Sequence, residues 1–280
     1  MLVVLAMALL AANPLAVVRK PAANMYSAAT EQAGVVSQAI YGSIVALLEA
    51  KDGWARVRTP DDYTGWMPET SLRKLPAGQK AYAAEGRVAQ VVALFANLYR
   101  EPDVTRHRPA MTVPFETRLE ILAKPKDNPR WLEVRLVDSD TAWVQRGDVT
   151  FETAAMPMPA VIALGRRFLG LPYLWGGTST YGFDCSGFVQ MLCRRRGILI
   201  PRDAQPQAGW SGFAPVERHD LRPGDLVYFG QSVGKITHTG MYLGDGQFIS
   251  ATAHSQPTVR IDRLDDPYWS QLFVAARRLK

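Results

Sequence analysis

A repeated arrangement of aromatic residues constrains the fold of this chain more than any other feature. The triplet Asn24-Met25-Tyr26 recurs as Asn97-Leu98-Tyr99. Each triplet is followed by a strand-like segment, Trp54–Arg58 or Trp131–Arg135, in which apolar and polar residues alternate as in half-buried strands. A second tryptophan stands twelve residues after the first in both copies, at Trp66 and Trp143. The repeat predicts two consecutive all-β units of about 60 residues each.

Each copy resembles the bacterial SH3-like barrels that are common in envelope proteins. We expect the first barrel at residues 17–76 and the second at residues 86–151, both built from short strands joined by many turns. On this interpretation most of the tryptophans belong to barrel cores.

A third domain is predicted after a linker. Residues 153–159 contain two prolines, which end regular structure. We expect a short helix at residues 160–170 and a second helix at residues 186–196, which Asp184 can cap. Strand-like segments follow at residues 225–229, 239–243, 248–251 and 259–261, with a tight turn at residues 244–246. Helices followed by antiparallel strands predict an α+β domain at residues 157–280.

The first sixteen residues are a possible signal peptide. Residues 2–12 carry no charge, and their number suits a signal-peptide core but is too small to span a bilayer. A positively charged start is missing, so a buried first strand is the alternative. We expect export to the periplasm, the cell envelope or the medium, with cytoplasmic peptide recycling as the alternative. No other stretch is expected to form an integral membrane segment.

The net charge of +6 is concentrated in places, as in Arg194-Arg195-Arg196 and Arg277-Arg278. A basic balance can indicate nucleic acid, an anionic envelope polymer or only a solvated surface. No basic run is interleaved with aromatic residues and no nucleic-acid motif is present, so a nucleic-acid partner is not expected. A solvated surface is the simplest interpretation.

The two cysteines, Cys185 and Cys193, are eight residues apart, which is not the spacing of a zinc site. We therefore expect no metal and no other cofactor. On one helix their Cα atoms would lie roughly 12 Å apart, too far for a disulfide. Cys185 begins the predicted helix, where free backbone N–H groups and the helix dipole favour a thiolate. The alternative for Cys185 is a buried, inert thiol, which is also what we expect of Cys193.

Four sequence blocks give Cys185 a context: Pro172–Gly177, Phe183–Val189, Leu221–Phe229 and His238–Gly244. In this order they resemble the NlpC-type family of bacterial cell-wall cysteine peptidases, over residues 160–280. With SH3-like barrels before them, the chain is similar to the subgroup that cleaves γ-D-glutamyl-diamino acid bonds in murein peptides. The implied fold class is multidomain, with two small SH3-like β-barrels followed by an α+β, circularly permuted papain-like domain.

The resemblance implies a role for three residues near the reacting bond. Cys185 matches the family nucleophile and His238 the family base. Tyr173 matches a residue whose hydroxyl helps to bind the oxyanion, which is chemically sound because donors aimed at developing charge contribute strongly to catalysis. A core aromatic is the alternative for Tyr173.

Substrate binding is implied for three more residues. Asp184 and Ser186 match residues that hold the free α-amine of the first residue of the peptide, since a carboxylate selects an ammonium over an acylated nitrogen. Asp184 can at the same time be the N-cap of the helix. Tyr63 of the first barrel matches a tyrosine near that amine, with a turn aromatic as the alternative.

The third catalytic residue departs from the family pattern. The family usually places a polar residue, often His, twelve positions after the base, and this chain has Ser250 there. His254 follows four residues later and would share the same strand face if the strand continued. We expect His254 to orient His238, with Ser250 as the alternative.

The expected function is a cysteine endopeptidase that hydrolyses γ-D-glutamyl-diamino acid amide bonds in murein peptides with a free N-terminal L-Ala. One alternative is a non-catalytic module in which the barrels bind the wall and Cys185 is unreactive. Another is an amidase or acyltransferase on the same fold. A serine hydrolase is disfavoured because Ser186 is not in a G-x-S-x-G setting.

Overall fold

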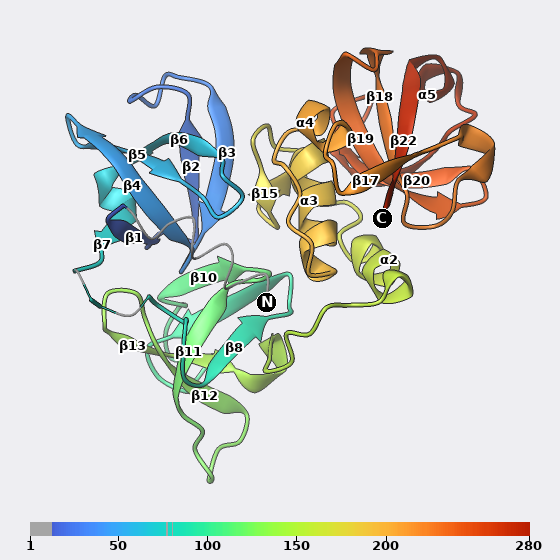
Figure 1. The fold of residues 1–280 in the computed structure, drawn as a ribbon. Helices are drawn as coiled ribbons and strands as arrows, with labels where there is room; N and C mark the ends of the chain where they lie inside the picture. The colour runs from blue at the N-terminus through green and yellow to red at the C-terminus, as the bar shows by residue number, and fades with distance from the viewer. Residues whose placement is uncertain (1–12, 77, 80) are drawn as a thin grey trace. The chain divides into compact units, whose positions relative to one another are not determined.

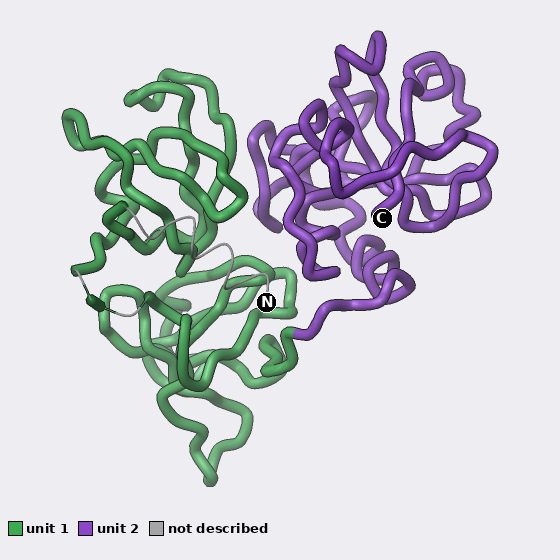
Figure 2. The backbone as a smooth tube through the Cα atoms, in the orientation of Figure 1, with its two compact units in different colours: residues 1, 3–153 green, residues 2, 154–280 purple. Residues whose placement is uncertain are grey.

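The computed structural model describes residues 13–76, 78, 79 and 81–280. They form two compact units, one up to residue 153 and one from residue 154 onward (Figure 2). The possible signal peptide lies outside the described residues up to residue 12, whereas Leu15 and Ala16 begin the first strand and Ala16 is fully buried. No helix in the described ranges is long and apolar enough to cross a membrane.

The first unit contains two seven-stranded antiparallel sheets (Figure 1). Their orders are β3-β2-β6-β5-β4-β1-β7 and β10-β9-β13-β12-β11-β8-β14, so each strand of the second sheet matches the strand numbered seven lower in the first. The first sheet and its 3-10 turn comprise β1 (Leu15–Val18), β2 (Ala22–Tyr26), β3 (Val35–Ile40), β4 (Ile44–Lys51), β5 (Trp54–Arg58), β6 (Thr64–Pro68), η1 (Glu69–Ser71) and β7 (Leu72–Lys74). The second comprises β8 (Val88–Val91), β9 (Phe95–Tyr99), β10 (Met111–Pro114), β11 (Arg118–Ala123), β12 (Trp131–Arg135), β13 (Thr141–Gln145), η2 (Arg146–Asp148) and β14 (Val149–Thr150).

The predicted repeat is confirmed, because the same aromatic residues meet in both sheets. The tyrosine of each triplet contacts the first tryptophan edge-on, with ring centroids 5.6 Å apart in the first copy and 5.5 Å in the second. The same tyrosine pairs in the backbone ladder with the second tryptophan. These pairs are Tyr26–Trp54 and Tyr26–Trp66 in the first copy, and Tyr99–Trp131 and Tyr99–Trp143 in the second.

The expectation of two closed barrels is not confirmed, because neither sheet closes on itself among the described residues. The outermost strands β7 and β14 have three and two residues, so they offer few backbone groups for a closing ladder. Trp131 is buried as expected, but Trp54, Trp66 and Trp143 are only half-buried. The cores consist mainly of smaller aliphatic side chains, which pack more easily between short strands.

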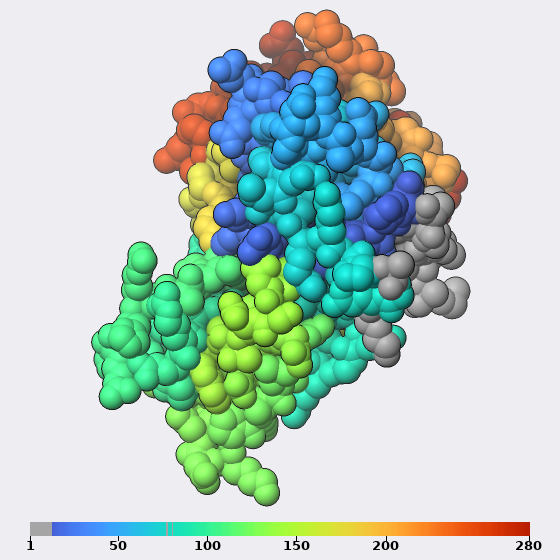
Figure 3. Space-filling model, turned by 90° about the vertical axis from the view of Figure 1, so that its left-hand side faces the viewer, coloured from blue at the N-terminus to red at the C-terminus, as the bar shows by residue number. Residues whose placement is uncertain are grey.

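The two sheets of the first unit share buried contacts. Tyr41, from the turn after β3, packs with residues of the second sheet, and its hydroxyl accepts a hydrogen bond of 2.6 Å from the backbone N–H of Val137. Burial raises the pKa of Tyr41 to about 12, so this phenol stays protonated. Away from these contacts, the loop 124–130 between β11 and β12 projects from the second sheet (Figure 3).

The second unit is an α+β fold, as predicted, with one antiparallel sheet of order β17-β22-β18-β19-β20-β21. Helix α3 packs against β19 and β20. The strands are β17 (Phe213–Val216), β18 (Leu226–Ser232), β19 (Lys235–Gly244), β20 (Gln247–Thr252), β21 (Thr258–Arg263) and β22 (Phe273–Leu279), with a separate two-stranded ladder of β15 (Thr178–Ser179) and β16 (Gly182–Phe183). The helices are α2 (Met158–Arg166), α3 (Cys185–Arg195), α4 (Ala204–Ala208) and α5 (Pro267–Leu272), with a 3-10 turn η3 at Arg218–Asp220.

Both predicted helices of this unit are present, and the tight turn at residues 244–246 has positive φ angles throughout, as its Gly-Asp-Gly sequence requires. The sequence did not indicate β17 or β22. Both strands lie at one side of the sheet. Strand β22 contains Arg277 and Arg278 near its end, and these two charged residues interrupt the apolar pattern that would indicate a strand.

Candidate active site

Asp184 fixes the start of helix α3 and thereby places Cys185 at its first position. The Asp184 carboxylate accepts a hydrogen bond of 2.7 Å from the backbone N–H of Gly187, which is the predicted N-cap interaction. Gly187 has to be glycine, because a Cβ atom there would overlap the carbonyl oxygen of Gly177. The short sequence Asp184–Gly187 thus encodes both the helix start and the close approach of the preceding loop.

The Cys185 sulfur lies against strand β19. Backbone N–H groups of Thr239 and Ser186 adjoin it and favour its thiolate form. Burial works more strongly in the other direction and, together with the Asp184 carboxylate, raises the pKa of Cys185 to about 12. The expected lowering of this pKa is therefore not found, since the thiol is buried and stands beside an acid. Thr239 directly follows His238, so the sulfur contacts the strand that carries the candidate base.

His238 is held between a hydroxyl and an aromatic ring. Its Nε2 lies 3.0 Å from Oγ of Ser250 on the neighbouring strand β20. Its ring stacks on Trp269, with centroids 4.8 Å apart and an interplanar angle of 30°. Burial lowers the pKa of His238 to about 3, with smaller contributions from Arg260 and His254. The imidazole is therefore neutral at neutral pH.

Ser250, rather than His254, contacts the candidate base. Strand β20 ends at Thr252, so His254 is not on the strand face that it would share with Ser250. His254 instead stacks flat on Tyr268, with centroids 3.6 Å apart, and among the described residues no hydrogen bond joins it to His238. The end of the strand is what separates the two alternatives.

A buried arginine that the sequence analysis missed completes the surroundings of Cys185. Arg202 is 2% exposed and forms an ion pair with Asp184, with Nη2 2.6 Å from Oδ2 and Nη1 3.0 Å from Oδ1. Nη1 also donates to Oγ of Ser186 over 2.9 Å, and the N–H of Gly176 donates to Oδ2 of Asp184. The sequence offered one signal for this residue: a single arginine directly follows the apolar segment Gly197–Pro201. An arginine that is buried with such a segment has to form an ion pair.

Two further predicted residues lie in different places. Tyr173 is half-buried beside the site, and its pKa is raised by burial and by the nearby Cys185 and Asp184. Tyr63 belongs to the first unit, between β5 and β6, and packs against the core of the first sheet. Its contact with a substrate amine stays a prediction.

Comparison with known proteins places the chain in a family. The NlpC/P60 family pattern matches residues 170–278, and that of the bacterial dipeptidyl-peptidase SH3 domain matches residues 25–72. The γ-D-glutamyl-L-lysine dipeptidyl-peptidase of Bacillus cereus is 35% identical over 258 residues, which cover 86% of this chain and 74% of the relative. The chain belongs to the NlpC/P60 family.

A relative from another species and a solved structure also match most of the chain. The γ-D-glutamyl-L-lysine dipeptidyl-peptidase of Bacillus subtilis is 30% identical over 257 residues, covering 87% of this chain and 81% of the relative. A crystal structure of an NlpC/P60 family protein from Bacillus cereus has a TM-score of 0.79 at 27% identity and covers 95% of this chain and 99% of that one. The NlpC/P60 match spans Cys185, His238 and Ser250, and the SH3 match spans Tyr63.

Proposed function

We propose that this NlpC/P60 protein is a cysteine peptidase that hydrolyses the γ-D-glutamyl-diamino acid amide bond of murein peptides. The observation that carries the proposal is the meeting of α3 and β19, where the Cys185 sulfur adjoins the backbone next to His238 and Ser250 holds the imidazole. The names of the two Bacillus relatives, both γ-D-glutamyl-L-lysine dipeptidyl-peptidases, support the choice of bond.

In the proposed first step, the Cys185 sulfur attacks the amide carbonyl carbon while its proton passes to Nδ1 of His238. Nδ1 is the free ring nitrogen because Nε2 is engaged with Ser250. Both groups begin neutral, so proton transfer accompanies attack and no preformed ion pair is needed. The imidazolium then protonates the leaving amine, the C–N bond breaks and a thioester remains. Water, deprotonated by His238, hydrolyses that thioester and restores the thiol.

Charge that develops on the carbonyl oxygen needs donors. Tyr173 is suited to this role, because its hydroxyl stays protonated at neutral pH and lies near the sulfur. A backbone N–H near Cys185 would be the second donor. Ser250 is assigned as the positioning residue for His238 in place of His254, because its hydroxyl meets the ring directly.

Recognition of a free N-terminal L-Ala amine is assigned to Asp184 and Ser186. The Asp184 carboxylate already accepts from Arg202 and from two backbone N–H groups, so an ammonium would share an oxygen with these donors. Arg202 offsets the charge of Asp184. The proposed preference for an amine over an amide nitrogen therefore depends on hydrogen bonds from the ammonium to a carboxylate oxygen of Asp184 and to Ser186. Comparison of free and N-acetylated murein tripeptides measures that preference.

We also assign the second sheet to a second SH3-like domain, on the strength of its matching strand order and aromatic pairs. The cell wall, outside the cytoplasmic membrane, is the proposed place of action because the substrate class occurs there. Detection of the tagged protein in cell fractions tests this, and retention in the cytoplasm would favour peptide recycling.

The activity is tested by mass spectrometry of L-Ala-γ-D-Glu-L-Lys digests with wild-type protein, Cys185→Ala and the matched control Cys193→Ala. Wild type and the control should release L-Ala-γ-D-Glu, because Cys193 is buried in the helix away from the site, whereas Cys185→Ala should release none. Undiminished release by Cys185→Ala would contradict the proposal. Absence of release by wild type, with no alkylation of Cys185 by iodoacetamide, would favour the non-catalytic wall-binding alternative.

A further inference from the structure

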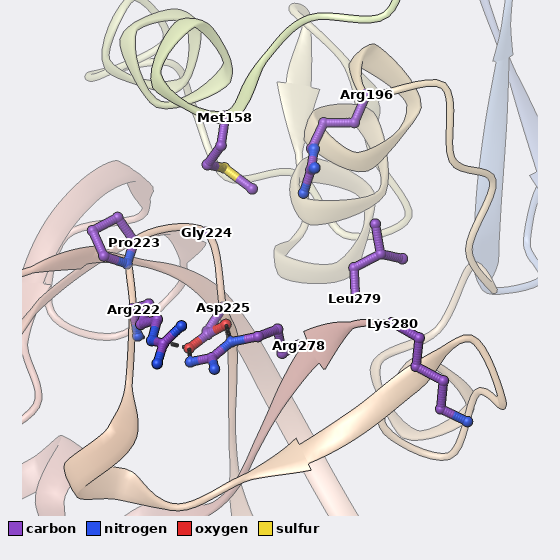
Figure 4. Close-up of a pocket in the computed structure, with 9 residues that line it drawn as sticks. All are labelled: Met158, Arg196, Arg222, Pro223, Gly224, Asp225, Arg278, Leu279 and Lys280. Atoms are coloured by element: carbon purple, nitrogen blue, oxygen red, sulfur yellow. Dashed lines mark hydrogen bonds and ion pairs between the residues drawn. The ribbon is translucent and has the colours of Figure 1, made fainter.

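A basic pocket of about 320 Å³ lies in the second unit, at the end of α3 opposite to Cys185 (Figure 4). It is lined by the start of α2, the residue after α3, the turn before β18 and the end of β22. Helix α3 has eleven residues, so its length separates the pocket from Cys185 by roughly 16 Å. None of the lining residues belongs to the candidate active site.

The one carboxylate of the pocket is already satisfied. Asp225 is 2% exposed, and its two oxygens accept from Nε and Nη2 of Arg278 over 2.8 and 2.7 Å. The backbone N–H of Arg222 donates to the same carboxylate over 2.7 Å. Asp225 and Arg278 therefore form a closed ion pair, and Asp225 has little capacity left for a second guanidinium.

Two other guanidinium groups border the pocket without such a partner. Within the described ranges, the side chains of Arg196 and Arg222 form no ion pair or hydrogen bond, and in Figure 4 the Arg196 side chain extends from the end of α3 toward the pocket. In Figure 4 the Lys280 side chain points away from the Asp225–Arg278 pair. The pocket thus holds two uncompensated positive charges.

The fold does not itself account for these two charges. The last turn of α3 already carries Arg194 and Arg195, which suffice to interact with the negative end of the helix dipole. Like charges that converge on one hollow repel each other unless an anion lies between them. Met158 and Pro223 add apolar walls, which reduce screening by water and strengthen attraction to an anion.

We propose that this pocket binds a phosphate group. Guanidinium forks match the oxygens of phosphate in two-point hydrogen bonds, and the surplus of two positive charges suits a dianionic phosphate monoester or two successive diesters of an anionic polymer. The site is separate from the peptidase chemistry and would hold either a small phosphorylated molecule or a phosphate-containing wall polymer. The proposed site would give an anion-binding function to basic residues that, from composition alone, are expected only on a solvated surface.

Isothermal titration calorimetry with inorganic phosphate at constant ionic strength tests the proposal on the full chain. Wild type should show saturable binding at one site, and Arg196→Ala/Arg222→Ala should bind about tenfold more weakly or worse. The matched control is Arg108→Ala/Arg166→Ala, which removes the same charge from two exposed arginines that form no ion pair in the described structure. It should bind phosphate like wild type. Further titrations with glycerol 3-phosphate and with poly(glycerol phosphate) separate a small monoester from a polymer as the source.

Absence of saturable binding of all three phosphate compounds to wild type would overturn the proposal. An equal loss in both double variants would do so as well, because it would show that only net charge matters. Far-UV circular dichroism and peptide hydrolysis should be unchanged in Arg196→Ala/Arg222→Ala, since within the described residues neither guanidinium forms an ion pair or hydrogen bond and neither residue belongs to the candidate active site. If that variant does not fold, the single change Arg222→Gln, at an exposed position, must weaken binding for the proposal to stand.

Discussion

Replacement of Ser250 by alanine tests the arrangement of the candidate active site most directly. Ser250 is fully buried and its Oγ lies 3.0 Å from Nε2 of His238. Alanine leaves that half-buried ring nitrogen without its hydrogen-bond partner. An unsatisfied buried group of this kind costs about 1–3 kcal/mol.

Most of this cost should appear as a lower rate. The imidazole has to present Nδ1 to the Cys185 sulfur, and Trp269 restrains the plane of the ring but not the ring nitrogen that faces the sulfur. If poorer orientation of the imidazole raises the activation free energy by about 1.4–2.7 kcal/mol, kcat falls about tenfold to a hundredfold. KM should change little, because Ser250 lies behind the ring and is not expected to touch substrate.

The assay is steady-state release of L-Ala-γ-D-Glu from the tripeptide, with kcat and KM determined separately for wild type, Ser250→Ala and His254→Ala. His254 stacks on Tyr268 and has no hydrogen bond to His238 among the described residues, so His254→Ala should retain most of kcat. A wild-type kcat in Ser250→Ala, or a larger loss in His254→Ala, would refute the reasoning. Thermal unfolding of both variants shows whether any loss of rate reflects loss of the fold.

Three further predictions follow from buried polar groups. Arg202→Ala should lower the free energy of unfolding by about 3 kcal/mol in urea titrations, because it leaves the buried Asp184 carboxylate without its countercharge, and an unchanged urea midpoint would contradict this. Since the pKa of His238 is lowered from 6.5 to about 3 in the folded state, the unfolded chain binds more protons below about pH 6.5, and stability should fall as the pH drops through that range. The decline in urea midpoint between about pH 7.5 and about pH 5 should be smaller in His238→Gln than in wild type, and equal declines would count against it. Tyr41→Phe should destabilise the first unit by about 1–3 kcal/mol, seen as an earlier thermal transition, because the buried N–H of Val137 loses its acceptor.

Local sequence signals predicted the parts of the fold that depend on local interactions. The N-cap Asp184 and the glycine at residue 187 specify the start of α3, and the repeated aromatic triplets specify equivalent sheets. The N-cap needs only residues that lie near one another in the chain, and the two sheets were predictable as equivalent because the same aromatic pattern occurs twice with the same spacing. The predicted closure of the sheets into barrels is not confirmed, because closure depends on whether distant end strands are long enough to pair.

The candidate site was predictable where it follows a motif and not where it depends on burial. Cys185 and the neighbour of His238 meet as the block order indicates, but the pKa of the thiol follows from its enclosure and from Asp184 rather than from the helix dipole. The position of Ser250 was identified, but its contact with His238, which His254 lacks among the described residues, depends on β20 ending at Thr252. Arg202 was missed because its partner lies eighteen residues away in the sequence.

Several hydrogen-bond donors surround Asp184, so a change at this residue would affect both the fold and the proposed selectivity for a free amine. One carboxylate joins the first turn of a helix, the loop before it and a distant guanidinium, so any replacement disturbs three segments together. A lineage that came to prefer acylated peptides could not lose this acid without destabilising the start of the helix that carries Cys185, the proposed nucleophile. Such a shift in preference would more readily begin at Ser186, the other residue proposed to hold the amine, while Asp184 stays in place.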